Sequence, residues 1–548
     1  MATDKPAGAA LQDTVDETAS GSSKEKVASS NDQYSGGLKE NASVDRANDV
    51  SAPPAYNGVE APAPSIAHED GAEINYHTLE WWQAGIIMIA ETVSLGILSL
   101  PAVLATLGLA PGIVLIVFLS VMSWYSGLVL GEFRRAYPWV QSFGDAGEVL
   151  GRSIGMGRFF QEFMGWAQTT FQIFVMGSHL LTWVICLNNL SDNRTTCSII
   201  WAVVGVFVFW VLNTPRTLKC ATYMSFLSFF SIFTAVMMTV IDVAVERPIG
   251  SASIDVSRQL GFTSAFLAAT NIAIAFSGHS CFFSVMSEFK KPEDWPKALA
   301  LLQVCDTTLY LVASVVIYVY GGPDVPSPAL TAAGSGKVRK AIWGIAIPTI
   351  VIAGVIYGHV AAKYIFLRLF GGTKHVAHRT RVGTAAWLAV TVGIWVIAFV
   401  IAESIPIFNN LLGLVAALFV SWFSYGFPGI LWLYMHSGEW FAGAKKTAMF
   451  AMSVALFVVG LVLCALGLWS SGEAIAQGGA AEPWSSHRRE LKGKQHLSGR
   501  MIDHQSITDE PRQGCAASGP FHKRLWLKSG RPILAPSSFE FRAVLPVL

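Results

Sequence analysis

Long apolar segments separated by short polar connections dominate the middle of the chain. A helix needs about 20 mainly apolar residues to cross the hydrocarbon core of a bilayer. Eleven segments approach this length: 83–108, 112–132, 160–187, 198–213, 220–243, 261–287, 298–320, 341–369, 384–403, 407–434 and 447–470. The fourth is short and the breaks at Pro111 and Pro406 are tight, so ten or twelve spans stay open as alternatives. The pattern predicts an all-α polytopic membrane protein with about eleven transmembrane helices.

Polar sequence flanks this membrane domain, which we place at residues 78–470. Residues 1–77 are rich in Ala, Ser, Asp, Glu and Pro, so they cannot bury enough apolar surface to fold and are predicted to be a disordered acidic tail. Lysines in this tail could accept ubiquitin and engage the endocytic machinery, or they are simply solvated. Residues 471–548 form a polar, basic tail, which is either disordered or an artefact of gene prediction.

The connecting loops indicate an orientation. If the N-terminus is cytoplasmic, the connections on the cytoplasmic side carry most of the Lys and Arg residues, Arg134, Arg135 and Lys290 among them, as the positive-inside rule requires. The loop after the third span holds two glycosylation sequons, at Asn189 and Asn193, which are usable only away from the cytosol. Chance sequons are common, so their use stays open.

Composition and the absence of some motifs limit the functions that the chain can have. Only 14% of the residues are charged and the net charge is +1, which disfavours a nucleic-acid partner. The seven cysteines include no CxxC pair, and no GxxxxGK[ST] or HExxH motif occurs. We therefore expect no enzyme, no metal site and no cofactor.

Two spans in matching positions contain polar, helix-weakening residues. The first combines Ser94, Gly96, Ser99 and Pro101, and the sixth contains Phe276-Ser-Gly-His279. Irregular backbone at membrane depth is tolerated only where it lines a cavity, and broken helices 1 and 6 point to a five-plus-five inverted repeat with a substrate site at the midplane. The exposed helix ends there would suit the two charges of an amino acid. Ordinary contacts of small residues between helices are the alternative.

Several short motifs in these regions occur in a familiar order. They are Gly96-Ile-Leu-Ser-Leu-Pro101, Tyr137-Pro, Phe143-Gly-Asp-Ala-Gly147, Ala275-Phe-Ser-Gly-His279 and Pro292-Glu-Asp-Trp-Pro-Lys-Ala298. With them the chain resembles the amino acid/auxin permease family, especially its fungal neutral amino acid permeases, over about residues 78–470. The resemblance implies a leucine-transporter-like fold and amino acid symport, commonly driven by protons.

The expected substrate-binding residues surround the two predicted breaks. They are Thr92, Val93, Ser94, Leu95, Gly96, Phe171, Phe276, Ser277, Gly278 and His279. A face of the third span that includes Gln172, Met176 and His179 could line the same pathway or pack against a neighbouring helix.

Three residues are candidates for proton coupling: Glu91, His279 and Asp306. Glu91 lies about 14 Å past the Trp81–Trp82 pair, near mid-bilayer, where a carboxylate is expensive and is a functional candidate by default. It would bind a proton or the substrate amine, or it would hold two helices together. His279 could relay protons or form an interhelical hydrogen bond, and Asp306 could act in coupling or be reached by cytoplasmic water.

These observations predict a secondary active transporter of amino acids, above all neutral ones, that uses a proton gradient and alternating access. The alternative is an amino acid sensor that keeps a transporter fold. The plasma membrane is the expected location, with the vacuolar membrane as the alternative. Uptake by purified protein in liposomes distinguishes the two functions.

Overall fold

The computed structural model of the chain describes residues 79–191, 197–216, 221–246, 254–334, 336–371, 373–378 and 380–478. The predicted acidic tail, the sequon at Asn193 and most of the predicted basic tail lie outside these residues. The helical elements are α1 (Trp81–Leu107), α2 (Leu109–Ala136), α3 (Phe143–Arg152), α4 (Gly157–Leu190), α5 (Ser198–Leu212), α6 (Ala221–Glu246), α7 (Phe262–Ala275), α8 (His279–Ser287), η1 (Pro292–Asp294), α9 (Trp295–Gly321), η2 (Ala329–Ala332), α10 (Gly336–Phe370), α11 (Lys374–Ala377), α12 (Arg381–Ser404), α13 (Phe408–Val415), the π-helical η3 (Ala416–Gly426), α14 (Phe427–Met435) and α15 (Ala444–Gly478).

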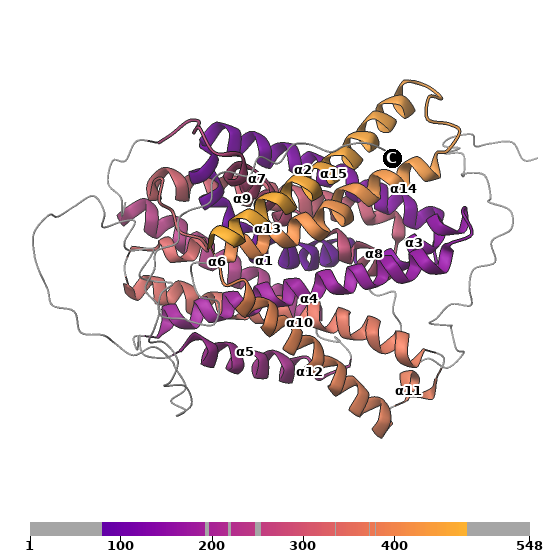
Figure 1. Ribbon diagram of the computed structural model, residues 1–548, viewed down its shortest axis with the longest axis horizontal. Coiled ribbons are helices and arrows are strands. Elements are labelled where there is room, and N and C mark those ends of the chain that lie inside the picture. Colours follow the sequence, from indigo (N-terminus) through magenta and orange to yellow (C-terminus); the bar gives the residue numbers. More distant parts are fainter. Residues whose placement is uncertain are drawn as a thin grey trace, which may run out of the picture. The chain divides into compact units, whose positions relative to one another are not determined.

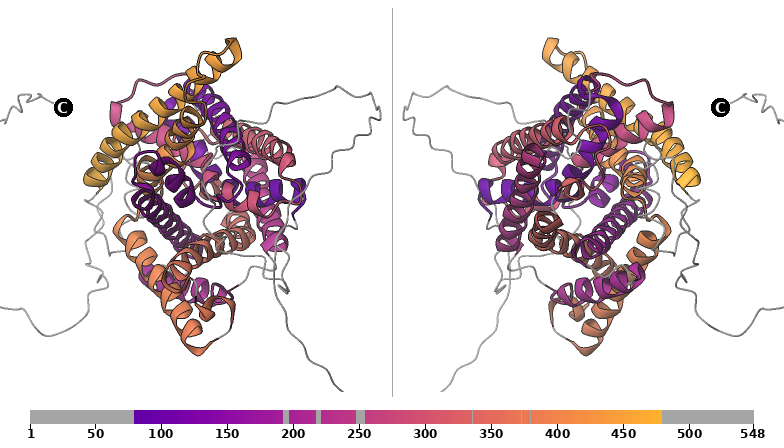
Figure 2. Two further views of the ribbon diagram at one scale, coloured as in Figure 1. Left: turned by 90° about the vertical axis from the view of Figure 1, so that its right-hand side faces the viewer. Right: turned by 90° about the vertical axis from the view of Figure 1, so that its left-hand side faces the viewer.

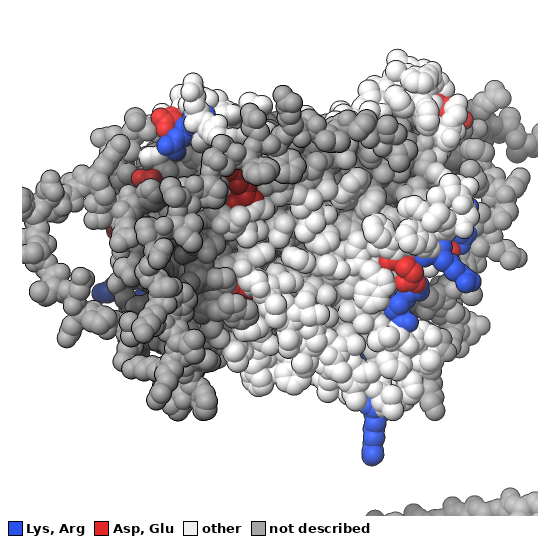
Figure 3. Space-filling model, viewed as in Figure 1, with Lys and Arg blue, Asp and Glu red and all other residues white. Residues whose placement is uncertain are grey.

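The helices confirm the all-α, multi-span prediction. Within the described residues, ten helices are long and apolar enough to cross a membrane, counting α7 with α8 and α13 through α14 as single spans. The predicted fourth span is α5, which has only 15 residues and is therefore about 22 Å long. Figure 3 shows a broad uncharged face, with Lys, Arg, Asp and Glu gathered mainly towards the helix ends, as lipid contact requires.

Helix α1 occupies the centre of the bundle. It lies between α15 on one side and α5 with α12 on the other (Figures 1 and 2), and 83% of its most apolar window is buried, against 22% for α15. Its neighbours include α6, α7 and α9. A helix surrounded by other helices can carry polar side chains that do not contact lipid. Glu91, Thr92 and Ser94 are buried polar residues of this helix.

The structure corrects the predicted break in the first span, because α1 is continuous from Trp81 to Leu107. The hydroxyl of Ser94 donates to the carbonyl of Glu91 (3.1 Å), and that of Ser99 donates to the carbonyl of Gly96 (2.9 Å), so both serines are satisfied inside the helix. Gly96 serves packing instead, since a Cβ there would lie 2.5 Å from the Cα of Ala275 on α7.

The predicted break in the sixth span is present. Helix α7 ends at Ala275 and α8 begins at His279, and the hydroxyl of Tyr310 on α9 donates to the freed carbonyl of Ala275 (2.8 Å). A buried carbonyl without a partner is costly, so this hydrogen bond stabilises the interruption. The paired breaks on which the five-plus-five repeat was predicted are thus reduced to one, and the repeat stays a prediction.

The continuous first span and the interrupted span α7–α8 are also joined at the end of the bundle predicted to be cytoplasmic. Leu79 forms a parallel β-bridge with Phe289, just after α8, and the Glu80 carboxylate pairs with the Lys290 ammonium at 2.7 Å. The start of α1 and the end of α8 are therefore held together.

Candidate functional site

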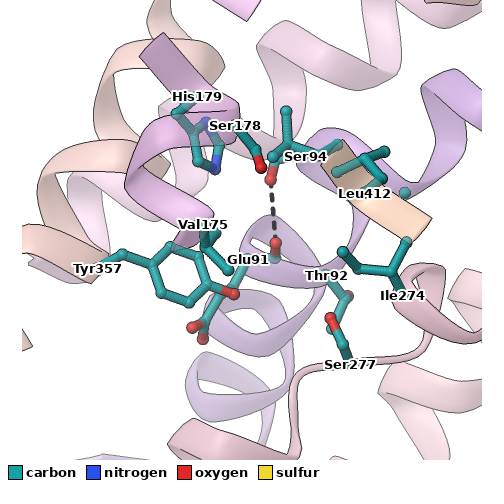
Figure 4. Close-up of a pocket in the computed structure, with 12 residues that line it drawn as sticks. Glu91, Thr92, Ser94, Val175, Ser178, His179, Ile274, Ser277, Tyr357 and Leu412 are labelled. Atoms are coloured by element: carbon teal, nitrogen blue, oxygen red, sulfur yellow. Dashed lines mark hydrogen bonds between the residues drawn. The ribbon is translucent and has the colours of Figure 1, made fainter. Parts of the chain in front are cut away.

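A pocket lies where α1 passes the break between α7 and α8 (Figure 4). Its lining comes from α1, α4, α7, the break, α10 and α13: Glu91, Thr92, Ser94, Leu95, Gly96, Val175, Ser178, His179, Ile274, Ser277, Tyr357 and Leu412. The empty space between these side chains is about 320 Å³, a figure that includes space open to solvent.

Glu91 supplies the only carboxylate among the residues that line the pocket. One of its oxygens accepts a hydrogen bond from the Cys281 thiol (2.7 Å), and the hydroxyl of Tyr357 is a further partner. No Lys or Arg among the described residues forms an ion pair with it. A buried carboxylate with neutral partners is suited to receive the cationic group of a ligand.

The wall opposite α1 is formed by α4 and α10. Figure 4 shows His179 and Ser178 of α4 on one side of the pocket and Tyr357 of α10 beside Glu91. The ring centres of His179 and Tyr357 are 6.1 Å apart, and His179 is fully buried. These side chains add hydrogen-bonding groups to the pocket without adding a fixed positive charge.

Four apolar side chains complete the lining. Leu95, Val175, Ile274 and Leu412 come from four different helices, and Figure 4 shows Val175 beside Tyr357, away from Ile274 and Leu412. Their side chains offer a ligand dispersion contacts and burial, but no hydrogen bond. The pocket thus combines one carboxylate, a few neutral polar groups and an apolar part.

The structure separates the predicted substrate-binding residues into two groups. Thr92, Ser94, Leu95, Gly96 and Ser277 line the pocket, whereas Val93, Phe171, Phe276, Gly278 and His279 are buried outside its lining. Phe171 packs against Phe419 and Phe423, and Phe276 contacts the ring of Tyr310 at 5.3 Å. These two aromatic residues therefore pack against other aromatic rings outside the pocket lining.

His279 faces away from the pocket. Its Nε2 lies 3.1 Å from the carbonyl oxygen of Ser123 on α2, and because a carbonyl can only accept, Nε2 carries the hydrogen. The ring packs against Phe282 at 4.6 Å. This is the interhelical hydrogen bond that the sequence left open as the alternative for this residue.

Asp306 on α9 also lies outside the pocket lining, yet it reaches a pocket residue. Its Oδ2 is 2.7 Å from the hydroxyl oxygen of Thr92, and only 2% of the residue is exposed. Burial of Asp306 on this side of α1 rules out open access to water in this conformation.

Several pocket residues were not predicted. Val175 lies four residues before His179 on the α4 face noted around that histidine, so helical spacing could have found it, whereas Ser178 is the neighbour of His179 in the sequence and points in another direction. Ile274 lies two residues before the predicted break, and Tyr357 lies in a Gly-rich stretch that fits a cation site or a packing seam equally well. Leu412 comes from a segment that carries no local signal for a site. The sequon residue Asn189 lies in the last turn of α4, where its amide donates to the carbonyl of Ile185 (2.8 Å). No group of three His, Cys, Asp or Glu side chains in the described ranges is placed to hold a metal ion.

Comparison with known proteins gives consistent results. The family described as transmembrane amino acid transporter protein matches residues 77–472. The chain is 31% identical to the N amino acid transport system protein of Neurospora crassa over 422 residues, which cover 75% of this chain and 88% of that protein. It is 28% identical to a transmembrane transporter of Gibberella moniliformis, over 73% of this chain and 84% of that protein.

Among solved structures, the crystal structure of MhsT in complex with L-phenylalanine covers 74% of this chain and 99% of its own chain, at 14% identity and a TM-score of 0.45.

Proposed function

The chain belongs to the transmembrane amino acid transporter family, and we propose that it is a symporter that moves neutral amino acids together with protons by alternating access. It is an integral membrane transporter rather than an enzyme. The symport mechanism, the proton and the neutral substrate are the proposed parts.

The observation that carries the proposal is the buried carboxyl group of Glu91 in a pocket that is otherwise neutral. An amino acid would place its ammonium group against Glu91, where a charge-assisted hydrogen bond contributes about 1.5–3 kcal/mol. Its side chain would meet Leu95, Ile274 and Leu412. Since no Lys or Arg lines the pocket, an acidic side chain would find no partner there.

Proton coupling is proposed because two of the buried carboxyl groups, Glu91 and Asp306, lie within the membrane domain and neither forms an ion pair among the described residues. Ionisable groups at this depth are expensive and are functional candidates by default. The energy source would then be the transmembrane proton gradient, with no bound cofactor.

The loop charges support a cytoplasmic N-terminus. We place the protein in the plasma membrane, with the vacuolar membrane as the alternative. We also propose that the lysines of the N-terminal tail accept ubiquitin and engage the endocytic machinery. A fluorescent fusion followed in cells, with and without the tail lysines replaced by Arg, tests both points.

Uptake by the purified full chain in proteoliposomes tests the function. A panel of labelled L-leucine, L-phenylalanine, L-glutamine, L-glutamate and L-lysine is offered under an inward proton gradient, an inward sodium gradient, or neither. We expect saturable accumulation of neutral members under the proton gradient, and its loss with a protonophore. Binding without accumulation would instead indicate a sensor, and accumulation with sodium alone would refute proton coupling.

A further inference from the structure

Two of the buried carboxyl groups, those of Glu91 and Asp306, differ in what surrounds them. Glu91 lines the pocket and has the thiol of Cys281 and the hydroxyl of Tyr357 as partners. Asp306 lies behind α1, where its Oδ2 meets the hydroxyl of Thr92 at 2.7 Å and its Oδ1 has no hydrogen-bond partner among the described residues. A substrate can therefore reach Glu91, but it cannot reach Asp306 directly.

We propose that Asp306 binds and releases the transported proton, and that Thr92 is a positioning residue whose hydrogen bonds change in the pocket when Asp306 becomes charged or neutral. This inference rests on the proposed proton symport and assigns separate roles to the two carboxyl groups. Glu91 receives the substrate, and Asp306 carries the proton.

No counter-charge competes with a proton at Asp306. The helices α1, α2 and α6 and the short segments η1 and η2 pack against α9. Their ionisable side chains in the described ranges are Glu91, Tyr125, Glu132, Arg134, Arg135, Tyr223, Asp242, Glu246, Glu293 and Asp294. None of these acts on Asp306, whose side-chain partner is Thr92. Within α9, the charge of Asp306 interacts with the side chains of Cys305 and Tyr310. A buried carboxylate without a cation is neutralised most readily by a proton.

The hydroxyl of Thr92 has one hydrogen and two directions in which to donate it. When Asp306 is ionised, Thr92 donates to Oδ2. When Asp306 is protonated, its O–H donates to the Thr92 oxygen, and Thr92 donates instead to the carbonyl of Met88 at 3.0 Å. Protonation thus reverses one hydrogen bond, with the proton taken up from one side of the membrane and released to the other.

Thr92 also connects Asp306 to the break between α7 and α8. It lines the pocket, and its methyl group lies against Gly278, where an added Cβ would be only 2.6 Å away. Gly278 lies in the break between α7 and α8. A change in the hydrogen bonding of Thr92 would therefore act next to Gly278, where the backbone between α7 and α8 is irregular.

The first test is Asp306→Asn, which keeps the shape and removes the titration. Proteoliposomes with one pH unit across the membrane and the potential clamped at zero can accumulate a substrate up to about tenfold with one proton. We expect wild type to approach this value with the neutral amino acid of the panel that it transports best. The variant should fall to equal concentrations on both sides, while exchange of internal unlabelled for external labelled amino acid persists.

The second test keeps the carboxyl group and changes its partner. Thr92→Val retains the methyl group and loses the hydroxyl, so the pH of half-maximal uptake should rise by about one unit, because the ionised carboxylate loses its hydrogen bond. Thr92→Ser retains the hydroxyl and should keep the wild-type midpoint, whatever its effect on rate. A purely structural role for Thr92 would alter the rate in both variants and leave the pH midpoint in place.

The outcomes separate this inference from the proposed function. Absence of proton-driven uptake by wild type overturns both. Wild-type accumulation by Asp306→Asn, or an unchanged midpoint in Thr92→Val, overturns the assignment of Asp306 alone. If Glu91→Gln loses proton-driven accumulation but keeps exchange, and Asp306→Asn behaves as wild type, the proton site is Glu91.

Discussion

Gly96 offers a direct test of how α1 and α7 are packed around the pocket. A Cβ added at this position would lie 2.5 Å from the Cα of Ala275 and 2.8 Å from its Cβ. The nearest atoms belong to the backbone and to a methyl group, so no flexible side chain can turn away. Gly96→Ala should therefore push α1 and α7 apart, next to the residues that line the pocket.

The expected size follows from two opposing effects. Carbon atoms in contact are about 3.5–4.0 Å apart, so the helices must separate by about 1 Å, and overpacking of this kind costs about 1–3 kcal/mol. Replacing a glycine inside a helix by alanine gains about 0.5–1 kcal/mol. The steric cost is the larger, and we expect Gly96→Ala to destabilise the protein by about 1–2 kcal/mol.

The assay is thermal unfolding of the detergent-solubilised protein, together with amino acid uptake in proteoliposomes. Gly393→Ala in α12 is the matched control, because a Cβ there meets no atom within 4 Å, so only the gain in helix propensity remains. We expect a lower unfolding temperature and impaired uptake for Gly96→Ala, and an equal or higher unfolding temperature for Gly393→Ala. If the two variants were equally stable and transported alike, the close contact between α1 and α7 would be refuted.

Three further predictions concern other contacts. Glu91→Gln should raise the KM for neutral amino acids about 10- to 100-fold, since it removes the charge that holds the ammonium group; an unchanged KM would exclude that role. Tyr310→Phe leaves the carbonyl of Ala275 without its donor and should cost about 1–3 kcal/mol of stability, measured by thermal unfolding against Tyr223→Phe, whose side chain is exposed. Lys290→Gln removes an exposed ion pair and should lower stability by less than about 1 kcal/mol, a difference that should vanish in high salt.

Near the two predicted breaks, the sequence located polar pocket residues better than it predicted whether each helix is interrupted. Ser94, Gly96 and Pro101 suggested an interrupted first span, but serine hydroxyls can be satisfied by carbonyls of their own helix, and glycine can serve close packing as well as a bend. The same residue types therefore fit a continuous helix, and only the neighbouring α7 decides which occurs.

Residues far apart in the chain explain why part of the pocket was missed. Tyr357 and Leu412 belong to α10 and α13; Leu412 looks like an ordinary membrane residue in its own segment, and Tyr357 fits a packing seam there as well as a site. His279 looked like a site residue because it follows the break, yet its ring turns to Ser123 on α2. The direction of a side chain depends on the helix packed beside it, and one segment of sequence does not contain that information.

The sequence alone determined that the chain crosses a membrane many times and that Glu91 and Asp306 are unusual, because hydrocarbon thickness and the expense of a buried charge depend only on local composition. Tertiary structure decided that these two carboxyl groups lie on different sides of α1, one in the pocket and the other behind Thr92. Neighbouring residues on a helix point about 100° apart, and the helices packed against each direction determine what each residue can bind.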